Sequence, residues 1–489
     1  MKIGIDISTI LNHGIDIGSG RYIYNLIKHL ILINCKKNSG FEQFSNFEQF
    51  SNQCIKNKQT NIELMESIEL ILTARYTTDE NLHILEDFKN LIQSHNLTKS
   101  HKKSPEKLKL SFKLFKTTPK RLSLWDKFRF PPIEMLGFSA DIFHCPDFLI
   151  PPTLNKNIIL TINDLAFIRF PQFNFDWFIK KYTNEVKKNA LRAKKIIAIS
   201  NSTKQDIINF FNLDENKIYV TYLAADDIFR KLSQVEIDRL VLEKFKINKK
   251  IILSVGTIEP RKNYPKLIKA FNLLKKQINS NANLSDNTGL SIGSYNNTSN
   301  TSGNTNINNG KVGNNIGDYI SNNISDNTKD NINDYMLVIA GRTGWKSEST
   351  FEEYNKSPYK NDIIFTGRVT DEELLNLYNL AEIFVYPSFF EGFGLPIVEA
   401  MKCGLPVVAS NCSSIPEIVS YKNYKEALFN PENENEIAQK ILKVLKDKKI
   451  KQQLSEESTE IAKNFNWQKT ANQTLKIYKE ICKDLNINI

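Results

Sequence analysis

The sequence predicts an α/β protein with more than one domain and with parallel β-sheets. The chain has 489 residues, which is more than a single hydrophobic core usually serves. Short apolar runs such as Ile251–Gly256 and Ala381–Pro387 alternate with longer amphipathic runs. The short runs are continuously apolar, as expected for strands that are buried on both faces of a parallel sheet.

The composition favours a partner that is rich in phosphate. The formal charge is +11 and the pI is near 9.0, so nucleotides, nucleic acids and anionic lipids all fit the charge. No run of 18 apolar residues occurs, and the first residues lead into a strand rather than a signal peptide. The cysteines show no CxxC pair and no zinc-like spacing, so we expect reduced thiols in a cytoplasmic protein. They are Cys35, Cys54, Cys145, Cys403, Cys412 and Cys482.

The first strand is predicted at Lys2–Ile7, and the first amphipathic helix at Tyr22–Leu32. Between them lies a loop with Gly14, Gly18 and Gly20. A strand, a glycine loop and a helix form a turn that suits phosphate, because the helix N-terminal N–H groups lack partners. The same turn occurs in any doubly wound fold, so the glycines alone do not identify a site.

Three segments interrupt the α/β pattern, and we interpret them as insertions. Two, at 36–61 and 97–125, lie in the first half, and the third, at 279–333, lies in the second half. The third is dominated by Asn, Ser, Gly, Thr and Asp, so it buries too little apolar surface to order itself. It inserts into its domain without dividing it.

The stretch Lys99–Arg129 is strongly basic. It carries eleven Lys or Arg residues and two acidic residues, with Leu, Phe and Trp between them. Such a mixture fits an anionic membrane surface, and it also fits a solvated loop or a nucleic-acid contact. Of these we expect attachment to the inner face of a membrane, and no nucleic-acid partner.

Polar residues follow two further predicted strands of the first half, Asp141–Pro146 and Ile158–Leu165. The carboxyl ends of parallel strands face the ligand crevice, so His144, Asn163 and Asp164 are candidates for the acceptor or catalytic side. His144 also fits a structural histidine. Asn163 forms hydrogen bonds but does not transfer protons.

The second half begins with the strand Ile251–Gly256, and the basic pair Arg261-Lys262 follows in the next loop. A helix at Pro265–Gln277 comes next. Further strands are predicted at Met336–Ala340, Ile363–Gly367 and Ala381–Pro387, with a helix capped by Thr370 before the last of them. The tail is helical, with a break at Phe465–Trp467.

The rest of the chain is organised around Glu391–Glu399, which follows the strand Ala381–Pro387. Pro396 suits the first position of a helix, which places Glu399 in the first helical turn, and Gly404 suits the residue after its end. The helix N-terminus favours an anion, and Gly392 and Gly394 let a ligand approach the main chain. Two carboxylates would repel phosphate but accept bonds from hydroxyls, so the site suits a sugar and a ribose joined by a diphosphate.

These residues resemble the E-x7-E motif of retaining GT-B glycosyltransferases of glycosyltransferase family 4. The segments Gly256–Asn263, Phe365–Val369 and Gly404–Ser410 fit the same family in order and spacing. The resemblance implies a GT-B fold with two Rossmann-like doubly wound domains that face a central cleft. It implies an acceptor-binding domain at 1–235, a nucleotide-sugar-binding domain at 245–463, and a final helix at 464–489 that crosses back to the first domain.

The resemblance also implies the site. Arg261, Lys262 and Glu391 are expected to be catalytic, with the basic pair neutralising the diphosphate and Glu391 holding the sugar, whereas Glu399 holds the ribose. No metal or other cofactor is expected. The expected donor-binding residues are Gly18, Gly20, Gly256, Arg342, Gly367, Arg368, Val369, Glu391, Gly392, Phe393, Gly394, Leu395 and Glu399.

The expected reaction transfers a hexose, with mannose favoured, to a saccharide or lipid-linked saccharide acceptor. A GDP-sugar donor is favoured and a UDP-sugar is the alternative. Two departures from the family pattern, Asn163 and Thr257, leave open a degenerate nucleotide-sugar binder or a membrane-surface adaptor. An epimerase on the same fold is disfavoured by the spacing of Glu391 and Glu399.

Overall fold

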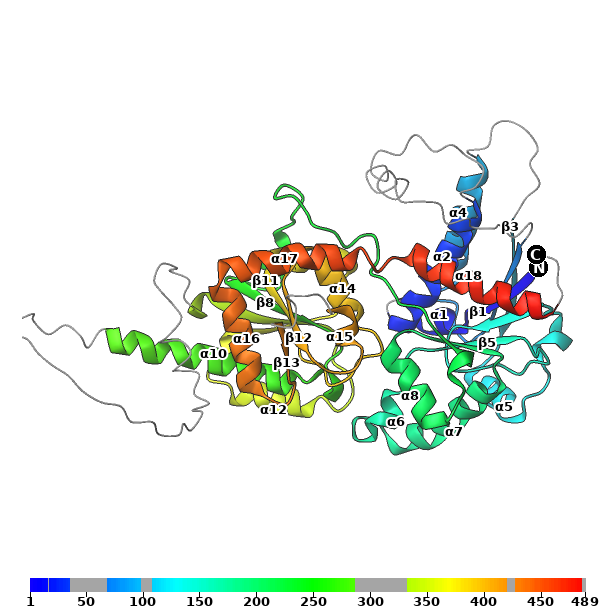
Figure 1. Ribbon diagram of the computed structural model, residues 1–489, viewed down its shortest axis with the longest axis horizontal. Helices are drawn as coiled ribbons and strands as arrows, with labels where there is room; N and C mark the ends of the chain where they lie inside the picture. The colour runs from blue at the N-terminus through cyan, green and yellow to red at the C-terminus, as the bar shows by residue number, and fades with distance from the viewer. Residues whose placement is uncertain (16, 36–67, 98–107, 286–331, 420–426, 486–489) are drawn as a thin grey trace, which may run out of the picture. The chain divides into compact units, whose positions relative to one another are not determined.

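The computed structural model describes residues 1–15, 17–35, 68–97, 108–285, 332–419 and 427–485. The chain forms two compact units, which are described separately below (Figure 1). Unit 1 comprises Met1–Asp226, Glu391–Leu395 and Lys463–Ile489, and unit 2 comprises Asp227–Phe390 and Pro396–Ala462. The predicted insertion at 36–61 and most of that at 279–333 lie outside the described residues.

Unit 1 contains a seven-stranded parallel sheet with the order β3-β2-β1-β4-β5-β6-β7. The strands β4 and β5 are buried along their whole length, which explains their continuous apolar sequence. Strand β1 pairs with β2 on one side and β4 on the other, so the strand order reverses there. The strands are β1 (Lys2–Asp6), β2 (Ile68–Tyr76), β3 (Leu108–Lys116), β4 (Ile142–Cys145), β5 (Ile158–Ile162), β6 (Lys195–Ala198) and β7 (Ile218–Val220).

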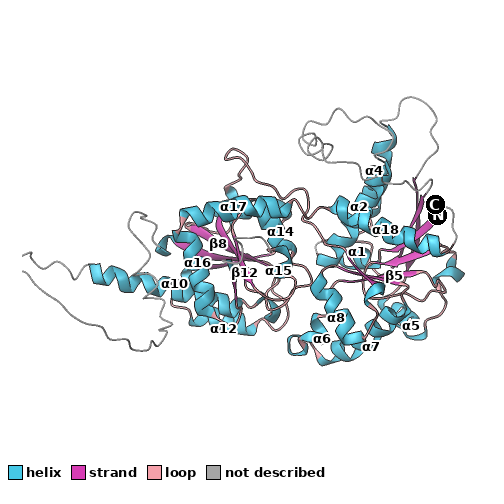
Figure 2. Ribbon diagram, viewed as in Figure 1, coloured by secondary structure: helices cyan, strands magenta, loops and turns pink. Residues whose placement is uncertain are grey.

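Helices cover both faces of this sheet (Figure 2). Ser200 caps α8 by accepting a hydrogen bond from the Thr203 N–H at 3.0 Å. The last helix, α18, packs against α2, where the rings of Tyr22 and Trp467 lie 6.4 Å apart. The helices are α1 (Ser8–His13), α2 (Gly18–Cys35), α4 (His83–Leu97), α5 (Pro119–Phe128), α6 (Ala166–Arg169), α7 (Asp176–Arg192), α8 (Asn201–Phe211) and α18 (Trp467–Asp484).

The interpretation of 97–125 as an insertion is wrong for its second part. Strand β3 (Leu108–Lys116) pairs with β2 along nine residues, and α5 follows it. Apolar residues alternate with Lys109 and Lys113 in this strand, which is the period of a strand at the edge of a sheet. Lysines on an edge strand also oppose pairing with another chain. The net charge of the stretch concealed this alternation.

The structure also differs from the prediction of a glycine loop after β1. Gly18 and Gly20 lie in the first turn of α2, and the short helix α1 precedes them. A Cβ atom on Gly20 would lie 2.2 Å from the carbonyl oxygen of Gly14. The close approach of these two segments therefore accounts for the glycine at position 20.

Unit 2 contains a six-stranded parallel sheet with the order β10-β9-β8-β11-β12-β13. Strand β8 lies between β9 and β11, so the strand order reverses beside β8 and the crevice of this doubly wound sheet opens at its carboxyl end. The strands are β8 (Lys250–Val255), β9 (Tyr335–Ala340), β10 (Ile363–Gly367), β11 (Ala381–Tyr386), β12 (Val407–Ser410) and β13 (Leu428–Phe429).

The helices of unit 2 begin and end with strong local signals. Thr370 and Glu373 form a capping box at the start of α13. Gly404, with φ of +72°, ends α14 in a Schellman motif, in which the N–H of Leu405 donates to the Ala400 carbonyl at 3.0 Å. The helices are α9 (Leu240–Lys244), α10 (Tyr264–Ser285), α12 (Glu348–Lys356), α13 (Asp371–Leu380), α14 (Leu395–Lys402), α15 (Ile415–Ile418), α16 (Glu434–Lys446) and α17 (Lys448–Ala462).

His144 lies in the core of unit 1. Its side chain is fully buried, with Nδ1 2.7 Å from the Tyr478 hydroxyl on α18 and Nε2 2.9 Å from the Thr161 hydroxyl on β5. Burial lowers the pKa of His144 to about 3, so the ring is neutral at physiological pH. Both ring nitrogens are occupied within the core, which is the arrangement of a structural histidine, and we propose no catalytic role for it.

Acidification should destabilise unit 1 through His144. The pKa of His144 is lower in the folded chain than its ordinary value, so stability is lost as pH falls below about 6.5. Between pH 7 and pH 5 this group should account for a loss on the order of 2 kcal/mol. Urea unfolding at both pH values should show that His144→Gln reduces the difference in free energy of unfolding between pH 7 and pH 5 by this amount. The matched change at the exposed His83, His83→Gln, should leave it unchanged, and an equal effect of the two substitutions would contradict the account.

Candidate functional site

Three glycines stand at the carboxyl ends of neighbouring strands in unit 2. Gly256, Gly341 and Gly367 end β8, β9 and β10, and all three have positive φ. The Gly341 N–H donates to the Gly367 carbonyl at 3.0 Å. A Cβ atom on Gly341 would lie 2.1 Å from the Gly256 carbonyl oxygen, so only glycine allows this approach. The three loops therefore start from one closely packed backbone layer.

Arg261 connects two of the loops that the sequence analysis selected. It lies in a 3₁₀ turn, Pro260–Lys262, after β8. Its guanidinium donates to Glu259 Oε1 at 2.7 Å through Nη2 and to the Phe390 carbonyl at 2.8 Å through Nη1. The N–H of Phe389 donates back to the Arg261 carbonyl at 2.9 Å. Arg261 thus holds its own loop against the segment that immediately precedes Glu391.

Glu259 changes the local charge and was given no role by the sequence analysis. Its side chain is 3% exposed, and Oε1 also accepts from Arg261 Nε at 3.1 Å. Glu259 Oε2 is buried and has no hydrogen-bond partner among the described residues. The charge of Arg261 is therefore partly offset by this carboxylate. An acidic residue two positions before Arg261 is the signal in the sequence that could have identified the pair.

Lys262 is buried beside the end of β11. Its Nζ donates to the Tyr386 hydroxyl at 2.8 Å and lies 5.0 Å from the centre of that ring. The next residue, Asn263, has φ of +58°, and its side chain donates to the carbonyls of Pro387 and Pro431. These contacts place the basic pair between the carboxyl ends of β8 and β11, where the strand order of unit 2 reverses.

Glu399 is held by Tyr378, a residue that the sequence analysis did not select. Glu399 is 4% exposed on α14, and its Oε2 accepts from the Tyr378 hydroxyl at 3.0 Å. Burial raises the pKa of Tyr378 well above its ordinary value, and the nearby Glu399 raises it further, so this hydroxyl stays protonated and donates. Helix α14 begins at Leu395, so the expectation that Glu399 lies in its first turn is wrong.

The segment Glu391–Leu395 belongs with unit 1. A Cβ atom on Gly392 would lie 2.5 Å from the carbonyl oxygen of Asn163, so the approach of these two backbones accounts for this glycine. The sequence analysis had assigned it to the approach of a ligand. Phe393 is buried, and its ring lies 5.9 Å from that of Tyr222 and 5.5 Å from that of Phe465. Phe393 thus anchors the segment in an aromatic cluster.

The remaining predicted residues occupy strand ends. Asp164 accepts a hydrogen bond from the Ala166 N–H at 3.0 Å at the start of α6. Arg342 and Arg368 follow β9 and β10, and both are exposed. Within the described ranges, no cluster of three or more His, Cys, Asp or Glu side chains could hold a metal ion.

Comparisons with known proteins find glycosyltransferases. The family described as "Glycosyl transferases group 1" matches residues 318–461. The chain is 27% identical to "O-antigen chain mannosyltransferase B" of Escherichia coli over 69% of its own length and 74% of that protein. It is also 27% identical to "Serotype-specific mannosyltransferase WbdA" of Escherichia coli, over 58% of its own length and 28% of that protein.

Solved structures share the fold at low identity. The "Sucrose-phosphate synthase (tll1590) from Thermosynechococcus elongatus" matches with a TM-score of 0.61 and 14% identity, over 99% of this chain and all of that one. The two parallel doubly wound sheets are those of the GT-B fold, as the sequence predicts. The chain therefore has the GT-B fold of a glycosyltransferase, and its residues 318–461 carry the match to the group 1 family.

Proposed function

We propose that the chain transfers a hexose, with mannose favoured, from a GDP-sugar to the hydroxyl of a saccharide or lipid-linked saccharide. The observation that carries this proposal is the basic pair Arg261-Lys262, which is joined to the segment before Glu391 at the reversal of the strand order. The mannosyltransferases among the relatives support mannose as the transferred sugar. The GDP-sugar donor is proposed from the family resemblance alone. UDP-sugars are the alternative donor.

The proposed transfer requires stabilisation of the negative charge on the leaving group. When the glycosidic bond breaks, negative charge develops on the departing diphosphate. Lys262 and Arg261 supply fixed positive charge at the strand ends, where little reorganisation is needed. Glu391 would accept hydrogen bonds from the hydroxyls of the transferred sugar, and Glu399, positioned by Tyr378, would accept bonds from the ribose. Retention of the anomeric configuration is proposed from the family resemblance.

Replacement of Glu391 tests the proposed function directly. With GDP-mannose as donor, Glu391→Ala should lower the rate of GDP release in the presence of acceptor by at least about a hundredfold, or roughly 2.7 kcal/mol of barrier. Thermal unfolding should stay close to that of the natural chain. Glu432→Ala, at an exposed glutamate of unit 2, is the matched control and should keep full activity. Full activity of Glu391→Ala would remove Glu391 from the site.

Unit 1 also carries an apolar surface that supports attachment to a membrane. Phe128, Phe130, Met135 and Leu154 are each more than 60% exposed. Hydrogen bonds hold their segments together: Arg129 donates to the carbonyls of Ile150 and Pro151, and Glu134 accepts from the Leu154 N–H at 2.9 Å. We call these four exposed side chains the apolar patch.

Basic residues lie next to this apolar patch. Helix α5, which leads into Phe128, has no buried residue and carries Lys120, Arg121 and Lys127. Exposed aromatic and basic side chains together suit an anionic lipid surface. No helix within the described ranges has the length and apolar character needed to cross a bilayer. We therefore propose peripheral attachment at the inner face of a membrane, where a lipid-linked acceptor would be presented.

Flotation with lipid vesicles tests this attachment. The protein should float with vesicles that contain phosphatidylglycerol and less with pure phosphatidylcholine, and added salt should weaken the binding. Phe128→Ser combined with Phe130→Ser should reduce the floated fraction about fivefold or more, since each exposed phenyl ring loses its burial in lipid. Val235→Ser, at an exposed apolar residue of unit 2, should have no effect. Equal flotation of both variants would contradict the proposal.

A further inference from the structure

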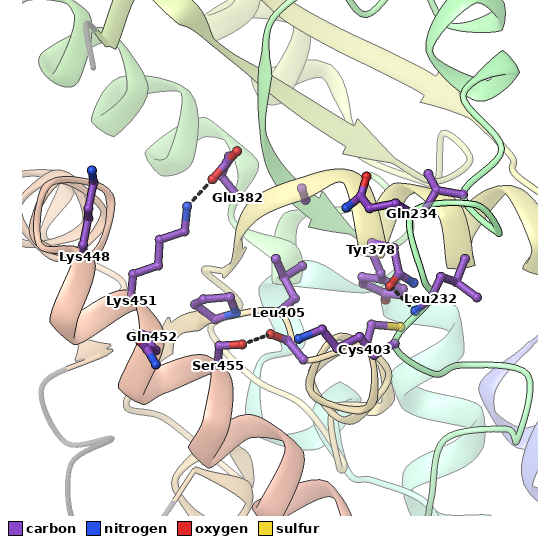
Figure 3. Close-up of a pocket in the computed structure, with 16 residues that line it drawn as sticks. Leu232, Gln234, Tyr378, Glu382, Cys403, Leu405, Lys448, Lys451, Gln452 and Ser455 are labelled. Atoms are coloured by element: carbon purple, nitrogen blue, oxygen red, sulfur yellow. Dashed lines mark hydrogen bonds and ion pairs between the residues drawn. The ribbon is translucent and has the colours of Figure 1, made fainter. Parts of the chain in front are cut away.

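A cavity of about 380 Å³ lies in unit 2, away from the proposed donor site. Its lining includes Ala381 and Glu382, which begin β11, and Pro406, which precedes β12. Figure 3 shows Glu382 and other lining residues. The proposed donor residues instead follow the carboxyl ends of the strands. The six residues of β11 separate the two edges by roughly 16 Å. The cavity is therefore a different place from the donor site, and we call it the lysine-lined cavity.

The lysine-lined cavity has an excess of positive charge. Lys231, Lys448 and Lys451 line it, and Glu382 is the one acidic residue in its lining. Glu382 forms an ion pair with Lys451, which Figure 3 shows as a dashed line. Lys448 and Lys451 are three residues apart on α17 and share one face of that helix. Two lysine charges, those of Lys231 and Lys448, are thus not offset by an acidic lining residue.

The rest of the lining suits a small polar body rather than a bare ion. Gln234 supplies an amide, and Ser455 supplies a hydroxyl that donates to the Gly404 carbonyl at 2.6 Å. Leu232, Ile237 and Leu405 add apolar contact. The volume is at the lower end of the range for small-molecule sites, which is the size of a phosphorylated sugar rather than of a dinucleotide.

We propose that the lysine-lined cavity binds a phosphate monoester with a hydroxylated carbon body, such as a hexose phosphate. A phosphate monoester carries a charge of about −1.5 to −2 at neutral pH, which matches the charges of Lys231 and Lys448 that no acidic residue of the cavity lining offsets. Lysine binds phosphate as a point charge on a flexible stem, so the group needs no bidentate geometry. Amide and hydroxyl side chains then contact the hydroxyls of the carbon body.

An occupant of this cavity would touch a residue that also serves the proposed donor site. Tyr378 lines the cavity, and its hydroxyl donates to Glu399 Oε2. The segment around Leu232 is fixed in the same place, because the Leu232 N–H donates to the Asn379 side chain at 2.8 Å. A ligand in the cavity is therefore in direct contact with a side chain that positions Glu399.

Calorimetric titration of the full chain with glucose 6-phosphate tests the proposal. GDP in excess keeps the proposed donor site filled, and the lysine variants below locate the binding in the cavity whether or not the donor assignment is correct. Wild-type protein should bind with a Kd of about 1 mM or tighter, and Lys231→Gln combined with Lys448→Gln should weaken binding about tenfold or more. The matched pair Lys246→Gln and Lys449→Gln, which lies outside the cavity, should change nothing.

Three results of these titrations would overturn the proposal. Absence of binding in the presence of GDP, or an equal loss in the matched pair, would show that the lysines of the cavity do not hold the ligand. Inorganic phosphate that binds as tightly as glucose 6-phosphate would show that the carbon body is not recognised. Thermal unfolding of both variants should match the wild type, since all four lysines are at the surface and only solvated charge is removed.

Discussion

The hydrogen bonds of Arg261 join the two loops on which the proposed donor site depends. Arg261 donates to Glu259 and to the Phe390 carbonyl, and its own carbonyl accepts from Phe389. These bonds run in both directions between the loop after β8 and the loop after β11, so neither loop moves freely without the other. A partly buried guanidinium requires such partners, because an unpaired charge in this position is strongly destabilising. The same residue thus supplies both positive charge and the connection to Glu391.

Close backbone contacts provide the rigid base for this connection. Gly256, Gly341 and Gly367 bring three strand ends together, and a side chain at Gly341 would collide with the Gly256 carbonyl. Helix α14, which carries Glu399, ends in the Schellman motif at Gly404. The hydroxyl of Tyr378 on α13 donates a hydrogen bond to Glu399 and holds its side chain. Charged groups with fixed partners on rigid elements need little reorganisation when charge develops on a leaving group. The geometry of unit 2 therefore favours a preorganised anion site over a flexible one.

Local patterns were sufficient to predict most elements. The strand Ile363–Gly367, the Thr370 cap and the break at Phe465–Trp467 were all predicted, because each depends on neighbours in the sequence. The family motifs then selected Arg261, Lys262 and Glu399. The pairing of Lys262 with Tyr386 and of Glu399 with Tyr378 depends on which strands and helices are adjacent, and a single sequence does not show this.

The errors have physical causes of the same kind. Strand β3 was interpreted as part of an insertion because its lysines dominate the composition, although its apolar residues alternate as in a strand. Gly20 and Gly392 were assigned to phosphate or ligand approach, whereas both allow one backbone segment to approach another. A glycine required by a distant carbonyl and a glycine required by a ligand have the same sequence signal. Only the fold distinguishes them.

Calorimetric titration with GDP and with guanosine tests the central claim most directly, because the two ligands differ only in the diphosphate. If Arg261 and Lys262 bind the diphosphate, Arg261→Gln combined with Lys262→Gln should weaken GDP binding by about a hundredfold, since each charged hydrogen bond contributes roughly 1.5–3 kcal/mol. The affinity for guanosine should stay the same. Unchanged GDP affinity, or an equal loss for guanosine, would contradict the account.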